Sequence, residues 1–271
     1  MSNPSFFNTI LVWPITNILV GIYHILNALN VPYPLGFSII VLTVVIRTIL
    51  YPLTASQLKA SKKMQELTPH LSNLREKHKK DAKKLQAETM KLYKEHGVNP
   101  AAGCLPVIVQ LPIIWALYSV LIQIVHLGSK VVVSEINKIV YFDGLKLTSS
   151  WNQYFFGLPL GQGPSNLISA VGPLILAVPF ITGFLQFVQS KMMFYQAEKK
   201  QDKLPSKEKK DDFASAFQSQ SLYIFPFMIA FFSYNFPIGL SLYWNTFTLF
   251  GIIQQYKITG LGGLSQWIKK Q

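Results

Sequence analysis

The chain has 271 residues, of which 50% are hydrophobic and only 14% are charged, and its formal net charge is +13. Soluble domains carry about 25% charged residues, so this composition argues against an ordinary soluble enzyme and indicates a protein that crosses the membrane several times. The single cysteine, Cys104, excludes an intramolecular disulfide and a cysteine-based metal cluster.

The first predicted element is a helix over residues 6–29, which is long enough to span the bilayer. One face of this helix is polar or small, with Asn17, Gly21, His24 and Ala28. The other face is apolar, with Leu11, Ile18, Ile22, Ile25 and Leu29. Such a division is typical of a helix that lies in the membrane interface. We favour that arrangement, although charge alone leaves a spanning helix open.

Five long apolar segments follow, and the last two are separated only by the corner at Phe236-Pro237, which predicts a tight hairpin. The distribution of basic residues predicts their orientation. Segments 55–99, 189–213 and 257–271 together hold 21 lysines and arginines, whereas the connection 128–165 holds 3. Because basic loops stay in the cytoplasm, we expect the N-terminus outside and the C-terminus inside the cell.

The predicted fold class is an all-α polytopic membrane protein with five transmembrane helices, an N-terminal interfacial helix and a cytoplasmic helical hairpin. The predicted extracytoplasmic parts are the interfacial helix, 1–33, and one loop, 128–165. The predicted spans are 34–54, 104–127, 166–188, 215–236 and 237–257. The predicted cytoplasmic parts are the helical hairpin, 55–103, a loop, 189–214, and the tail, 258–271.

The first basic loop is predicted to contain helices that are broken near Pro69 and again around residues 75–81. The helix after the second break has Asp81 as its N-cap and Gly97 as its C-terminal stop. It is only weakly amphipathic, so we expect a mobile projection and not an independent domain. Residues 196–212 are predicted to form a flexible linker because they combine low hydrophobicity with mixed charge.

One arginine, Arg47, lies inside the first predicted span, about 10 Å from its cytoplasmic end at 1.5 Å per residue. Its side chain either extends to the inner headgroups or acts as a functional cation inside the helix bundle. The predicted spans contain no Asp or Glu, so a buried guanidinium would need water or neutral acceptors. Neutral polar side chains are plentiful in the other spans and include Gln110, Gln123, Thr182, Gln186, Gln189, Ser233, Asn235, Ser241, Asn245, Thr246 and Thr248.

The spans offer little for catalysis. They carry no carboxylate and no HExxH motif, and His126 is a lone histidine that we expect to be structural. The chain also has no glycine-rich phosphate loop. We therefore expect no enzymatic activity, no cofactor and no bound metal. A proton-coupled transporter would normally carry a membrane carboxylate, so the composition argues against that class too.

Five pieces of sequence, in order, carry a resemblance to a known family: LVWPITNIL, IIVLTVVIRTILYPLT, LYKEHGVNPAAGCLPVIVQLPIIWALY, FVQSKMM and FPFMIAFFSYNFPIGLSLYWNTFTLFGIIQQ. On these pieces, which extend over about residues 8–257, the chain resembles the YidC/Oxa family of membrane protein insertases, of the bacterial YidC type. We expect it to lack the large extracytoplasmic domain and the lipoprotein cysteine of some members.

The resemblance implies five spans around a groove that opens to the cytoplasm and the lipid. Arg47 occupies the place of the family's groove arginine, and Tyr243 and Trp244 match aromatic positions of the fifth span. Either Gln186 or Gln189 is similar in placement to a polar groove residue of the third span. The expected substrate groove comprises Arg47, Gln110, Gln186, Gln189, Tyr243, Trp244 and Asn245.

The function that the resemblance implies is that of an insertase and chaperone, which moves short hydrophilic tails across the bilayer and releases client helices into lipid. Expected partners are newly made membrane proteins and lipids, with the ribosome, the signal recognition machinery and the Sec translocon as further candidates. No specific nucleic acid is expected, and the expected location is the bacterial plasma membrane. Two alternatives are a small transporter or channel that uses Arg47 as an anion site, and a structural assembly platform.

Overall fold

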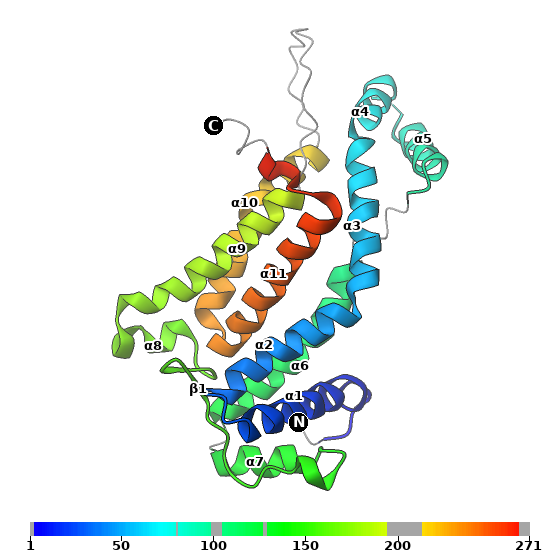
Figure 1. The fold of residues 1–271 in the computed structure, drawn as a ribbon. Coiled ribbons are helices and arrows are strands. Elements are labelled where there is room, and N and C mark those ends of the chain that lie inside the picture. Colours follow the sequence, from blue (N-terminus) through cyan, green and yellow to red (C-terminus); the bar gives the residue numbers. More distant parts are fainter. Residues whose placement is uncertain (1–2, 80, 99–104, 127–128, 194–212, 266–271) are drawn as a thin grey trace. The chain divides into compact units, whose positions relative to one another are not determined.

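The computed structural model describes residues 3–79, 81–98, 105–126, 129–193 and 213–265 (Figure 1). For residues 105–110, 123–126, 129–130 and 213–221 it describes the backbone but not the side chains. Cys104 and the predicted linker 196–212 lie outside the described residues. The side chains of Gln110 and His126 also lie outside this description.

The chain divides into two compact units. The first unit comprises Met1–Ile49, Val107–Gln186 and Phe225–Phe250, and the second comprises Leu50–Pro106, Phe187–Ile224 and Gly251–Gln271. Helices dominate both units, as predicted. Among the described residues, two helical stretches are long and apolar enough to cross a membrane, Asn8–Ala28 and Pro173–Met193. The pair Pro34–Ile49 and Tyr51–Glu66 makes a third if it is counted as one broken span.

The first unit begins with a π-helical turn, η1 (Asn8–Val12), which continues into α1 (Trp13–Ala28). The polar face of α1 packs against a later part of the chain: the Asn17 side chain donates to Ile139 O at 2.9 Å and accepts from Tyr141 N at 2.8 Å. The apolar face is the exposed one, and Ile25 keeps 62% of its surface. The two predicted faces are present, but it is the polar face that turns toward the protein.

The second predicted element does not run straight from 34 to 54. It consists of α2 (Pro34–Ile49) and α3 (Tyr51–Glu66), with a break at Leu50. Pro52 lies in the first turn of α3, and proline cannot donate the backbone hydrogen bond that would continue α2 past this point. α2 therefore ends at Ile49, two residues after Arg47, and the first stretch of the first unit ends there too.

The remaining elements of the first unit, and the helices that it shares with the second, follow in chain order. They are α6 (Leu105–His126), α7 (Ser129–Asn137), η3 (Asp143–Leu145), β1 (Tyr154–Phe155), β2 (Leu158–Pro159), α8 (Pro164–Val171), η4 (Pro173–Leu176), α9 (Ala177–Met193), α10 (Phe213–Asn235) and α11 (Ile238–Thr259). The strands form a short antiparallel hairpin that the all-α prediction did not contain.

Within the first unit, the strand hairpin contacts α2, and the loop after it contacts the start of α11. The Phe155 ring lies against α2 so closely that a Cβ on Gly36 would be 2.0 Å from it. Beyond β2, Leu160 O and Gln162 O accept the backbone N–H groups of Gly239 and Ile238, at 2.8 and 2.9 Å. These bonds satisfy donors at the start of α11, so they stabilise the predicted corner between α10 and α11.

The second unit contains α3, α4 (Thr68–Lys77), α5 (Ala82–Glu95) and the 3-10 turn η5 (Gly262–Leu264). The predicted cap is confirmed, because the Asp81 side chain accepts from Lys84 N at 3.0 Å. Gly97 has a φ of +62°, the left-handed conformation expected of a helix stop. The first break falls at Leu67, near Pro69 as predicted, and Pro69 itself lies in the first turn of α4, where proline is tolerated. No residue of α4 or α5 is fully buried.

Candidate functional site

Arg47 lies in the last turn of α2 and is 5% exposed. Its Nη2 donates a hydrogen bond to Phe247 O of α11 at 2.7 Å. Its guanidinium carbon is 3.4 Å from the centroid of the Phe247 ring and 5.9 Å from that of the Phe250 ring. The cation is therefore held by a neutral carbonyl and by aromatic faces, which attract it through their quadrupoles.

This geometry favours the second of the two interpretations of Arg47, the cation inside the helix bundle. The guanidinium is directed at α11 and is almost fully removed from the surface of the first unit. Its Nε is buried and has no hydrogen-bond partner among the described residues. A buried charged donor without a partner is costly, so a hydrogen bond from this Nε would lower the free energy of the site.

Tyr243 is fully buried, and its ring centroid is 6.0 Å from that of Phe247. Residues 243, 247 and 250 recur at intervals of four and three, so they share one face of α11. The neighbouring Trp244 is turned about 100° around the helix axis. Its Nε1 donates to Gln186 Oε1 of α9 at 3.1 Å. The two aromatic residues of the predicted groove therefore face different neighbours.

A layer of neutral polar side chains joins α9, α10 and α11 within the first unit. Ser233 of α10 lies 2.8 Å from the Ser241 hydroxyl and 3.2 Å from the Thr182 hydroxyl. Hydrogen bonds of this kind link helices in a membrane at about 1–2 kcal/mol or less each. Asn245 Oδ1 and Thr248 Oγ1, both on α11, are buried without a partner in the described part of the chain. The largely apolar interior of this unit therefore contains a polar layer, and its described spans carry no carboxylate.

The structure thus brings some of the predicted site residues together. Within the first unit, Arg47 approaches the face of α11 that carries Tyr243, and Gln186 pairs with Trp244. Gln189 belongs to the second unit and is half-buried there.

Sequence reasoning missed Phe247 and Phe250, the rings beside the guanidinium. Their spacing from Tyr243 was a usable signal, because it places all three rings on one helical face. What the spacing could not supply was the pairing of that face with α2.

A family model described as the 60Kd inner membrane protein matches residues 24–262. The chain is 33% identical over 227 residues to the membrane protein insertase YidC of Fusobacterium nucleatum, covering 84% of this chain and 87% of that protein. It is 30% identical over 262 residues to the membrane protein insertase MisCA of Bacillus subtilis, covering 95% of this chain and 81% of that one.

Other relatives are longer. The chain spans 50% of the membrane protein insertase YidC of Streptomyces avermitilis, to which it is 33% identical over 223 residues, or 81% of this chain. It also matches the crystal structure of an active YidC insertase with its first transmembrane domain resolved, with a TM-score of 0.55 at 24% identity. That match covers 94% of this chain and 47% of the solved one, and it establishes a shared fold.

Proposed function

Because the chain belongs to the family of the 60Kd inner membrane protein, we propose that it is a membrane protein insertase and chaperone. In this function it moves a short hydrophilic tail of a client protein across the bilayer and releases the client's apolar helix into lipid. The observation that carries the proposal is the buried charge of Arg47, which no carboxylate among the described residues contacts. The insertase names of the relatives favour this function over a transporter or channel.

The physical argument starts from the cost of moving a polar tail through hydrocarbon, where each unpaired polar group costs several kcal/mol. A polar groove that reaches part of the way across shortens the apolar distance. We assign to its lining Arg47, Gln110, Gln186, Gln189, Tyr243, Trp244 and Asn245. In this groove Arg47 pairs transiently with an acidic group of the tail, because attraction between charges is strong in a partly dehydrated site.

The same proposal includes the architecture around the groove. The chain has five spans, an outer interfacial helix at its N-terminus, and a cytoplasmic helical hairpin that contains α3, α4 and α5 and captures clients. The excess of basic residues in 55–99, 189–213 and 257–271 supports a cytoplasmic location for these segments in the bacterial plasma membrane. The partners are newly made membrane proteins, with the ribosome, the signal recognition machinery and the Sec translocon as further candidates.

The test is insertion of one single-span reporter whose tail carries an acidic, a neutral or a basic residue. The wild-type protein is compared with Arg47→Lys, Arg47→Ala and Arg47→Glu in liposomes at matched protein levels. A hydrogen bond to a charged group contributes about 1.5–3 kcal/mol, so Arg47→Ala should slow the acidic tail roughly tenfold or more and the neutral tail least. Arg47→Lys should keep much of the activity, and Arg47→Glu should be worst for the acidic tail.

The matched control is Lys138→Ala, which removes an exposed cation outside both the proposed groove and the cytoplasmic hairpin. It should leave the ratio of acidic to neutral insertion unchanged. If Arg47→Ala and wild-type proteins inserted all three tails in the same proportions, the electrostatic role of Arg47 would be wrong. Solute flux through the same liposomes, without insertion of any reporter, would instead support the transporter alternative.

A further inference from the structure

A second polar feature of the first unit lies away from Arg47. It is a cavity of about 450 Å³ between the C-terminal end of α1, the turn that leads to α2, and the segment 147–152. This volume lies in the range of about 300–1,000 Å³ that is usual for small-molecule sites. We call it the α1–loop pocket. The function proposed above does not use it.

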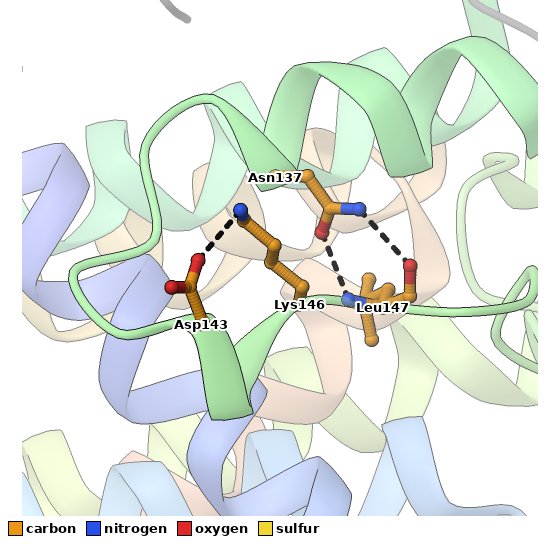
Figure 2. Close-up of polar contacts among 4 residues, drawn as sticks. All are labelled: Asn137, Asp143, Lys146 and Leu147. Carbon is orange, nitrogen blue, oxygen red and sulfur yellow. Dashed lines mark hydrogen bonds and ion pairs between the residues drawn. The ribbon is translucent and has the colours of Figure 1, made fainter.

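Hydrogen bonds fix the wall that the segment after η3 contributes. Asn137 clamps Leu147, because its Nδ2 donates to Leu147 O at 3.0 Å and its Oδ1 accepts from Leu147 N at 2.8 Å (Figure 2). His24 of α1, which lines the pocket, has its Nε2 3.1 Å from Leu145 O. Trp151, which is 3% exposed, packs its ring edge-on against Tyr23 at 5.6 Å. The pocket is therefore preformed and does not depend on a ligand to order it.

The turn that forms the opposite wall contains two residues with positive φ, Asn30 at +54° and Tyr33 at +53°, and both line the pocket. Asn30 ends α1 in the usual way, since Val31 N donates to Leu26 O at 3.0 Å, so only Tyr33 is unusual. The left-handed region is uncommon for side chains other than glycine, and especially for a bulky residue such as tyrosine. Such conformations persist only where the surroundings impose them, and they gather at ligand-binding positions.

The types of side chain that line the pocket limit which ligands it can bind. The lining residues include no Asp, Glu, Lys or Arg. The nearby Lys146 is paired with Asp143 at 2.6 Å, and this contact holds the pKa of Asp143 below its ordinary value (Figure 2). The polar lining consists largely of amides and hydroxyls, which both donate and accept hydrogen bonds. Of these, the exposed side chains of Asn27, Ser149 and Ser150 have no hydrogen-bond partner in the described residues.

These properties restrict the ligand. A phosphate headgroup would find no lysine or arginine in the pocket, where His24 is the one basic side chain of the lining, and an ammonium group would find no carboxylate. A ligand with several hydroxyl groups and no charge would match the mixed donors and acceptors, while the half-buried Tyr33 ring would cover an apolar C–H face. We propose that the α1–loop pocket binds an uncharged saccharide group, carried either by a neutral glycolipid or by a free sugar.

The test uses the full chain purified in an amine-oxide detergent, which contains no sugar. Native mass spectrometry compares binding of monoglucosyl diacylglycerol with binding of the same diacylglycerol without glucose. The wild-type protein should retain the glucosyl lipid preferentially. One neutral hydrogen bond contributes roughly fivefold to an affinity, so Asn27→Ala should weaken binding by about that factor. The triple variant Asn27→Ala, Ser149→Ala, Ser150→Ala should weaken it at least tenfold.

The matched control is Asn166→Ala, which removes an exposed asparagine of α8 outside the pocket and should leave binding unchanged. Competition by methyl β-glucoside would identify a free sugar as a sufficient ligand, whereas its failure to compete would assign the site to the glycolipid. Equal retention of the two lipids by the wild-type protein would overturn the proposal. So would unchanged binding by the triple variant. Neither readout involves insertion, so this proposal and the insertase function fail independently.

Discussion

Arg47 carries a charge at a position where its described neighbours are a backbone carbonyl and two phenyl rings. These neighbours reduce the cost of removing the guanidinium from water, because each interacts favourably with a cation. None of them carries a negative charge, so no described neighbour compensates the charge of the arginine. A bound carboxylate partner would have compensated that charge and left nothing to attract an acidic tail.

Trp244 and Gln186 illustrate a different kind of site residue, since each is the other's hydrogen-bond partner at 3.1 Å. Trp244→Phe keeps the aromatic ring but leaves the Gln186 acceptor, on a side chain that is 8% exposed, without its donor. An unsatisfied buried polar group costs about 1–3 kcal/mol. We therefore expect a lower thermal unfolding midpoint in detergent for this variant. Trp115→Phe, at a side chain that is 60% exposed, is the control and should change the midpoint little; equal midpoints for the two variants would contradict the prediction.

At the scale of elements, the sequence predicted helix ends and corners best, because these features depend mainly on interactions between residues that are close in the chain. The cap at Asp81 and the stop at Gly97 each depend on a few adjacent residues, whereas the corner at Phe236-Pro237 also relies on the distant carbonyls of Leu160 and Gln162. The break at Leu50 was missed, although Pro52 marks it, because the apolar run continues to Pro52-Leu53 and masks the interruption. The strand hairpin was missed because strands of two residues leave no measurable alternation.

The candidate site, like the fold, was predictable only in its local features. Its residue types and their positions along each helix could be read from the sequence. The partners could not, because the pairing of Arg47 with Phe247 joins residues 200 positions apart. The same limit applied to α1, whose polar face was recognised but whose contact with Ile139 and Tyr141 was not.

The packing of α2 on the strand hairpin makes a prediction at this scale. Gly36→Ala would place a Cβ 2.0 Å from Cδ2 of Phe155, in a ring that also packs edge-on against Phe37 at 5.4 Å. Overpacking costs about 1–3 kcal/mol, whereas alanine gains at most about 1 kcal/mol of helix propensity over glycine, so the free energy of unfolding should fall. Chemical denaturation in detergent measures the change.

Two further variants make that measurement decisive. Gly144→Ala is the control, because a Cβ there would meet no atom within 4 Å. In the background of Phe155→Ala the cost of Gly36→Ala should largely disappear, since the clash needs the ring. A cost that persisted in this background would show that the glycine is required for a reason other than the contact with Phe155.

At the scale of the whole molecule, the distribution of charge predicts the orientation in the membrane, which the packing of the helices does not. Two described helices, Asn8–Ala28 and Pro173–Met193, have the length and composition to cross a bilayer, and shorter apolar helical stretches occupy Leu111–Ile122 and Leu222–Asn235. Length and composition do not distinguish a spanning α1 from an interfacial one. The exposed apolar face of α1 suits either environment, because lipid contacts it in both arrangements. The side of the membrane reached by its N-terminal end separates the two.

Single cysteines at three exposed positions, in a Cys104→Ser background, measure this directly: Ser5→Cys, Lys84→Cys and Asp143→Cys. The asymmetry of 21 basic residues against 3 predicts that a membrane-impermeant maleimide labels Asp143→Cys from outside the cell and Lys84→Cys only after the membrane is opened. With an interfacial α1, Ser5→Cys should be labelled from outside together with Asp143→Cys. Protection of Ser5→Cys would make α1 a sixth span and leave the rest of the topology intact. Labelling of Lys84→Cys from outside would reverse the orientation, and the insertase proposal would then lose its cytoplasmic hairpin.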